Sequence, residues 1–231
     1  MYLCAFPAGG QGQDADALYG DRANIASARR SAELWTSAFA GDPQAFDAAW
    51  KLARVCYWLG GHAPVPERRR YLEQGIAAGR GAASLSPERP EGHFWLAANM
   101  GALSESFGLR AGLRYRKPIK ASLETVLRID PAFLDGAADR ALGRWYHKVP
   151  RLFGGNSKTA ESHLRASLRY NPDNVVSHCF LAELLADQDR TAEARTELQA
   201  VVDAPFTRDW APEEEDYKAR ARAMLAQLGS R

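Results

Sequence analysis

Four side chains in the first third of the chain could place a positive charge inside an aromatic surface. Arg54 is preceded by Trp50 and followed by Trp58, each four residues away, with Tyr57 beside them. Residues four apart share one face of a helix, where a guanidinium can hold a partner's carboxylate and aromatic rings supply contact area. The pattern predicts a partner-binding surface. Alternatively, the two tryptophans pack between neighbouring helices, and Arg54 finds a counter-charge inside the protein.

Residue types that catalyse reactions or bind metals do not occur in the spacings that this chemistry needs. The segment GGNSK at 154–158 lacks the spacing of a phosphate-binding loop, and neither GxSxG nor HExxH occurs. His93 and His178 each lie six residues after a proline, an equivalence that favours packing over metal ligation. The three cysteines include no CxxC pair, which argues against a zinc site. The sequence therefore predicts no enzyme, no cofactor and no metal.

Charge and hydropathy restrict the partners. The basic segment 108–120 contains an aromatic residue, as nucleic-acid-binding segments do, but 30 basic and 28 acidic residues leave a net charge of only +2. We therefore expect a solvated connector there and no nucleic-acid partner. No run of 18 apolar residues occurs, so no membrane span is predicted.

Four prolines mark an internal repeat. They lie 44, 44 and 41 residues apart, at Pro43, Pro87, Pro131 and Pro172. Proline ends a helix because it lacks the N–H donor and restricts the residue before it. Small residues recur ten positions after each proline, where two helices can approach closely: Ala53, Ala97, Ala141 and Ala182. The pattern predicts a helix-turn-helix repeat of the tetratricopeptide type, lengthened by inserted loops at 60–70 and 145–156.

The expected fold is all-α: a right-handed α-solenoid of irregular tetratricopeptide-like hairpins with a C-terminal capping helix at 212–228. The other helices are expected at 22–41, 44–60, 67–85, 91–108, 116–129, 132–147, 157–170, 174–187 and 191–203. The first helix of each repeat lines the concave face of such an array. This register adds Phe94, Trp145 and Tyr146 to the predicted binding residues.

The repeat, the Asp130–Pro131 turn, the helix LGRWYHK and the Gly154–Gly155 turn resemble the T-component proteins of TRAP-type transporters. The resemblance covers roughly residues 30 to 205. The chain is also similar to the regulator of microtubule dynamics family. The first resemblance implies a periplasmic scaffold that binds a solute-binding protein. The sequence lacks the family's lipoprotein cysteine and signal, so a cytoplasmic location is the alternative.

Two regions are expected along the chain. Residues 1–20 are interpreted as a flexible N-terminus or a signal-peptide remnant, because MYLCAFPAGG is apolar and ends in small residues. Residues 21–231 are expected to form a single helical array.

The leading hypothesis for function is a non-catalytic scaffold that docks a protein or peptide in its concave groove, including the transporter role that the resemblance implies. The alternative is a small-ligand-binding protein that sequesters an apolar or acidic molecule in an aromatic groove or channel. An oligomer is compatible with either hypothesis.

Overall fold

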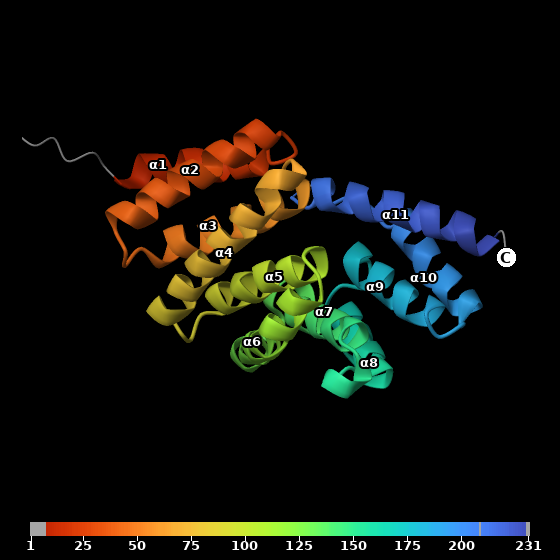
Figure 1. The fold of residues 1–231 in the computed structure, drawn as a ribbon. Helices are drawn as coiled ribbons and strands as arrows, with labels where there is room; N and C mark the ends of the chain where they lie inside the picture. The colour runs from red at the N-terminus through yellow and green to blue at the C-terminus, as the bar shows by residue number, and fades with distance from the viewer. Residues whose placement is uncertain (1–7, 208, 230–231) are drawn as a thin grey trace, which may run out of the picture. The chain divides into compact units, whose positions relative to one another are not determined.

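The structure is a computed structural model that describes residues 8–207 and 209–229. These residues form eleven α-helices and one 3₁₀ helix and contain no strand (Figure 1). The all-α fold predicted from the sequence is therefore confirmed. The chain divides into two compact units, residues 1–122 and 123–231. We call them the N-terminal unit and the C-terminal unit.

The N-terminal unit consists of helical hairpins. Its helices are α1 (Ala8–Gly20), α2 (Ile25–Gly41), α3 (Phe46–His62), α4 (Val65–Leu85), α5 (Pro90–Ser106) and the first part of α6 (Leu109–Ile129). Helix α1 packs on α2, α2 on α3, and α3 on α4, while α5 packs against both α3 and α4 (Figure 1). Successive hairpins thus stack through their neighbours, as tetratricopeptide repeats do.

The ends of these helices follow from local chemistry. Asn24 caps α2 by accepting a hydrogen bond from the backbone N–H of Ala26. Pro90 opens α5, where a missing N–H costs nothing because the first helical N–H groups have no helical acceptor. Asp42, the C-cap of α2, accepts from the backbone N–H of Gln44 and so shapes the turn at Pro43.

Small residues hold α4 and α5 at backbone distance. A Cβ atom added to Gly79 would lie 2.8 Å from the Cα atom of Leu96, so no larger residue fits without displacing α5. Ala53 and Ala97 are buried, as the repeat register predicted. The buried Asn99 donates hydrogen bonds to the carbonyl of Ala53 at 2.9 Å and to that of Trp95, which links α5 to α3.

The C-terminal unit contains two further hairpins and a last helix. After the end of α6 come α7 (Phe133–Lys148), the 3₁₀ helix η1 (Arg151–Phe153), α8 (Ser157–Tyr170), α9 (Val175–Ala186), α10 (Thr191–Asp203) and α11 (Ala211–Gly229). Helices α7 and α8 pair, α9 and α10 pair, and α11 packs on both α10 and α9 (Figure 1). Side chains of α11 cover apolar residues such as Cys179 and Val201, as expected of a capping helix.

The repeat register changes in α7. Three successive residues, Leu134, Asp135 and Gly136, have positive φ angles of 46°, 57° and 71°. Gly143 lies at the close approach to α8, where an added Cβ would be 2.5 Å from Leu164 Cγ, and Ala141 is only half-buried. The small residue at this contact therefore lies two positions later than the repeat spacing predicted, and the left-handed backbone of Leu134 and Asp135 was not predicted either.

The ten predicted helices all occur, with two further differences. Helix α6 begins at Leu109 instead of 116, so the expected connector at 108–120 is largely helical and Pro118 lies in the interior of the helix instead of its first turn. Helix α1 falls within residues 1–20, which we expected to be flexible or a signal remnant, and it buries Ala15 and Tyr19. Residues 1–7 lie outside the described residues, so the signal-peptide interpretation stays a prediction, as does the single array over 21–231.

Candidate partner-binding surface

Helix α3 carries the four residues that the sequence singled out, but they differ in how far each is exposed to solvent. Trp50 and Arg54 are half-buried, and Tyr57 is 38% exposed. Trp58 is 4% exposed, stacks on His62 and donates from Nε1 to the carbonyl of Arg22 at 2.8 Å. Trp58 therefore packs inside the N-terminal unit, in line with the alternative interpretation. The binding role of all four residues stays a prediction.

Arg54 meets a carboxylate of its own chain. Its Nη2 atom donates to Asp16 Oδ1 at 3.1 Å, and Lys51 Nζ lies 2.5 Å from the other oxygen of Asp16. The guanidinium lies 3.9 Å from the ring centre of Tyr19 and 5.0 Å from that of Trp50. Two cations of α3 thus share one acidic side chain of α1. We call this group the Asp16 site: Asp16, Tyr19, Trp50, Lys51 and Arg54.

Aromatic faces stabilise the cations of this site. The ammonium group of Lys51 lies 4.8 Å from the ring centre of Trp35 and 5.7 Å from that of Trp50. Trp50 is oriented by a 2.9 Å hydrogen bond from its Nε1 to Asp47. Because a π-face carries partial negative charge, each ring attracts the cation above it. The site therefore holds its positive charge close to the surface of α3.

The predicted residue of α5 extends this surface. Phe94 is half-buried and meets Trp95 edge-on, with ring centres 5.0 Å apart. Tyr57 of α3 approaches the same Trp95 ring, with ring centres 5.8 Å apart. Trp95 itself is buried. Tyr57 and Phe94 therefore flank one buried ring and form a continuous aromatic group across α3 and α5.

Trp145 and Tyr146 belong to the C-terminal unit and pack within it. Trp145 is 9% exposed and meets Tyr146 edge-on, and Tyr146 stacks on His163 of α8 with an interplanar angle of 9°. His163 in turn lies 2.7 Å from a carboxylate oxygen of the buried Asp139. The inserted loop returns to α7 through a hydrogen bond from the N–H of Asn156 to the carbonyl of Tyr146. These two rings therefore join α7 to α8.

A second charged group gathers in the C-terminal unit. Glu183 of α9 has 9% of its side chain exposed and faces Arg144 at 2.5 Å and Lys148 at 3.4 Å, both from α7. Arg220 of α11 forms a further ion pair with it. We call these four residues the Glu183 cluster. Burial of the neighbouring His147 holds its pKa below the ordinary value, against the opposing effect of its hydrogen bond to Asp187.

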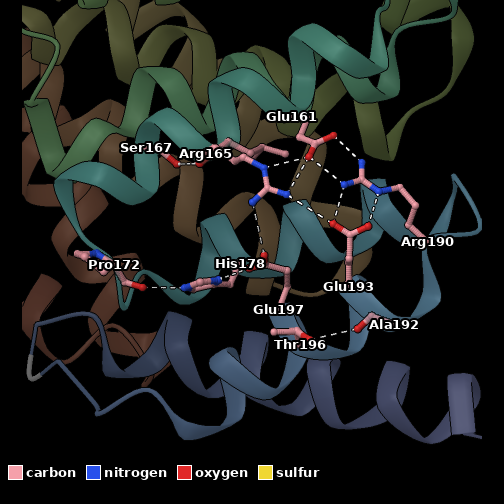
Figure 2. Close-up of polar contacts among 11 residues, drawn as sticks. Glu161, Arg165, Ser167, Pro172, His178, Arg190, Ala192, Glu193, Thr196 and Glu197 are labelled. Atoms are coloured by element: carbon pink, nitrogen blue, oxygen red, sulfur yellow. Dashed lines mark hydrogen bonds and ion pairs between the residues drawn. The ribbon is translucent and has the colours of Figure 1, made fainter.

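A polar network on the other helices of this unit is shown in Figure 2. Arg165 and Arg190 converge on Glu161, and Arg190 also pairs with Glu193 at 2.7 Å. Glu197 accepts from His178 Nδ1 at 2.6 Å. The network ties α8 to α10, so we interpret it as structural.

The two histidines at equivalent repeat positions make the same contact. His178 Nε2 lies 2.7 Å from the carbonyl oxygen of Pro172, and His93 Nε2 lies 2.9 Å from that of Pro87. Each ring therefore ties the end of the first turn of a helix to the proline turn before it. Among the described residues, no group of three or more metal-ligating side chains occurs.

Comparison with known protein families assigns this chain to one of them. Residues 13–161 match the family described as regulator of microtubule dynamics protein 1-3. The chain belongs to this family. The matched residues include α3 and α5 and end within α8, so Glu183 and Arg220 lie outside the match.

Solved structures support the fold. A thermophilic tetratricopeptide protein of Thermus thermophilus, TTC0263, superposes with a TM-score of 0.71 at 20% identity, covering 95% of this chain and all of that one. PilF of Pseudomonas aeruginosa gives 0.57 at 16% identity, covering 95% and 93%, and MamA gives 0.53 at 14%, covering 87% and 96%. No curated protein sequence matches. The tetratricopeptide-like fold predicted from the sequence is therefore confirmed.

Several residues of the Asp16 site and of the Glu183 cluster were not predicted from the sequence. Asp16 and Tyr19 lie in a segment for which no helix was expected, and 38 residues separate Asp16 from Arg54. The Glu183 cluster had a readable signal, because Arg144 and Lys148 are four residues apart on one helix. Among the described residues, no helix is long and apolar enough to cross a membrane.

Proposed function

We propose that this chain is a non-catalytic scaffold that binds another protein through the exposed side of α3 and α5. The observation that carries the proposal is the Asp16 site, where Arg54 lies over the rings of Tyr19 and Trp50 and the exposed Tyr57 follows three residues later on α3. Arg, Trp and Tyr are the residue types that dominate binding energy at protein interfaces. Aromatic side chains also lose little conformational entropy on binding, because they have few rotatable bonds.

The partner that the TRAP resemblance supports is a solute-binding protein, which would make the chain an exported accessory of a transporter. Periplasmic and cytoplasmic extracts of the native organism, passed separately over the immobilised full chain and read by mass spectrometry, test both the partner and the location. Capture of a solute-binding protein from the periplasmic extract alone is the expected result. Capture of cytoplasmic proteins only would contradict the exported role and leave the scaffold proposal standing.

The family match supports a second defined partner, since the family is named for microtubule dynamics. Co-sedimentation of the purified chain with polymerised tubulin tests this directly. We expect binding to saturate and to weaken in the Arg54→Ala variant if microtubules are the partner. A chain that stays in the supernatant at all tubulin concentrations excludes this partner.

The surface is tested with matched variants. We expect Arg54→Ala and Tyr57→Ala each to weaken capture of the purified partner by about tenfold, because hot-spot side chains typically contribute 1–2 kcal/mol or more. Arg80→Ala, at an exposed position of α4, is the control for loss of positive charge. Circular dichroism checks that all three variants keep their helix content. Equal binding by all three would contradict the assignment of the surface.

A further inference from the structure

The guanidinium of Arg54 uses only part of its hydrogen-bonding capacity. Asp16 accepts from Nη2, while the Nε atom is buried and has no hydrogen-bond partner among the described residues. Arginine binds carboxylates most strongly through two parallel N–H donors. A buried donor without an acceptor is also unfavourable, typically by 1–3 kcal/mol. In its contact with Asp16, Arg54 therefore uses one of the two parallel donors with which it could bind a carboxylate.

The charges at the site are also unbalanced. Lys51 and Arg54 each have 20% of the side chain exposed and share the single carboxylate of Asp16, which is 41% exposed. Trp35, under the ammonium group of Lys51, has a buried Nε1 with no acceptor among the described residues. Two cations therefore share one accessible carboxylate, and Arg54 and Trp35 each keep an unused N–H donor. This composition favours the binding of additional negative charge.

Helix α1, which supplies Asp16, has low intrinsic helix propensity. Helix α1 has the sequence AGGQGQDADALYG, with glycines at 9, 10, 12 and 20. Each glycine inside a helix costs up to about 1 kcal/mol relative to alanine. Among the α1 side chains that the structure describes, only Ala15 and Tyr19 are buried. Tyr19 also covers the face of the Arg54 guanidinium, so displacing α1 would uncover both cations.

We propose that α3 receives an acidic helical segment of the partner, and that Asp16 and Tyr19 of α1 occupy this site in the free chain. The partner segment is expected to carry a carboxylate and, three residues later, an aromatic side chain, in the same relation as Asp16 and Tyr19. Its carboxylate takes the place of Asp16 and accepts from both Nε and Nη2 of Arg54. Its affinity is therefore set by competition with α1. This inference rests on the proposed function.

The probe for this competition is a peptide with the sequence of residues 14–24, DADALYGDRAN, labelled with a fluorophore. Its binding to the full-length chain is measured by fluorescence anisotropy. Asp16→Asn in the chain weakens the internal competitor, and we expect it to bind the peptide about fivefold more tightly than the wild type. Adding Arg54→Ala to Asp16→Asn should reduce binding at least tenfold.

Matched controls separate competition from a general change in charge. Asp14→Asn removes the same charge at an exposed position of α1 and should leave the affinity within twofold of the wild type. A peptide in which asparagine replaces the residue equivalent to Asp16 should bind at least fivefold more weakly. Arg54→Lys keeps the charge but loses the paired donors, so it should bind between the wild type and Arg54→Ala.

Several outcomes would overturn the proposal. If Asp16→Asn binds the peptide equally or more weakly, Asp16 orients Arg54 and does not compete with a ligand. If the peptide binds neither the wild type nor any variant, α3 does not receive such a segment and the proposal is wrong. A concentration-dependent dimer of the Asp16→Asn chain, detected by light scattering, would assign the site to a second copy. Failure of the proposed function is distinguishable: no partner captured from any extract would contradict the scaffold, and capture that does not depend on Arg54 or Tyr57 would contradict the assigned surface.

Discussion

The Asp16 site of the N-terminal unit and the Glu183 cluster of the C-terminal unit use the same charge arrangement in different surroundings. In both, several cations converge on a single carboxylate that another helix supplies. The side chain of Asp16 is 41% exposed, whereas that of Glu183 is 9% exposed. Water can replace the contacts of an exposed carboxylate but not those of a buried one. We therefore expect that another carboxylate or water can replace Asp16 in its ion pairs, whereas the ion pairs of Glu183 are needed for the stability of the C-terminal unit.

The largest expected effect is the loss of the buried charge. Glu183→Gln keeps the shape of the side chain but leaves Arg144 with no counter-charge at that position, so we expect the C-terminal unit to lose about 3 kcal/mol of stability. Urea unfolding followed by circular dichroism measures the loss. Glu215→Gln, at an exposed position of α11, is the control and should change the stability by less than about 0.5 kcal/mol.

Two buried cysteines show which unit is affected. Cys56 of α3 and Cys179 of α9 are buried, and burial raises the pKa of both thiols, that of Cys179 to about 11. In a Cys4→Ser background, we expect Glu183→Gln to accelerate thiol labelling of Cys179 at least tenfold and to leave Cys56 unchanged. Acceleration at both positions would mean that the two units unfold together and would remove the basis for comparing them.

A smaller effect is expected at the exposed carboxylate. Asp16→Asn should lower the free energy of unfolding by no more than about 1 kcal/mol, because solvent screens a half-exposed ion pair. Raising the NaCl concentration should shrink the difference between the wild type and Asp16→Asn, since the Debye length falls below the size of the site. Urea unfolding at low and high salt measures both quantities. A loss as large as that of Glu183→Gln would contradict the comparison.

The smallest effect concerns pH in the C-terminal unit. Burial holds the pKa of His147, next to the Glu183 cluster, below the ordinary value near 6.5. The unfolded chain therefore binds more protons than the folded chain as the pH falls below about 6.5, and folding loses stability over that range. We expect His147→Gln to remove a loss of a few tenths of a kcal/mol between pH 7 and 5. Unfolding curves at both pH values check this.

His178 should show the opposite dependence. Burial alone would lower its pKa, but the hydrogen bonds to Glu197 and to the Pro172 carbonyl outweigh burial and raise it. The folded chain then holds the proton to higher pH than the unfolded chain, so this contribution is present below about 6.5 and is lost as the pH rises through the folded-state pKa. In His178→Gln, stability between pH 6 and 9 should therefore decline less than in the wild type. An unchanged decline would contradict the assignment.

Much of the fold could be predicted because proline turns, each followed ten positions later by a small residue, recur every 41 to 44 residues. Ten helices follow from that pattern, whereas α1 does not, because its glycines give it little helical signal. The sequence also indicated that Arg54 needs a carboxylate, but it could not identify Asp16. That pairing joins two helices through tertiary packing, which local periodicity does not encode. Likewise, nothing in the spacing reveals the left-handed backbone at Leu134 and Asp135 near the start of α7.

The glycine contact between α4 and α5 has a consequence for the thermodynamics of association. Because Gly79 lets the backbone of α4 touch that of α5 at Leu96, and Asn99 ties α5 to α3, these helices have little freedom to move apart. Tyr57 and Phe94 are therefore already held against Trp95 before any partner arrives. Binding on a preordered surface loses less conformational entropy. A substitution at Gly79, far from the binding residues in sequence, would weaken binding by increasing that entropic cost.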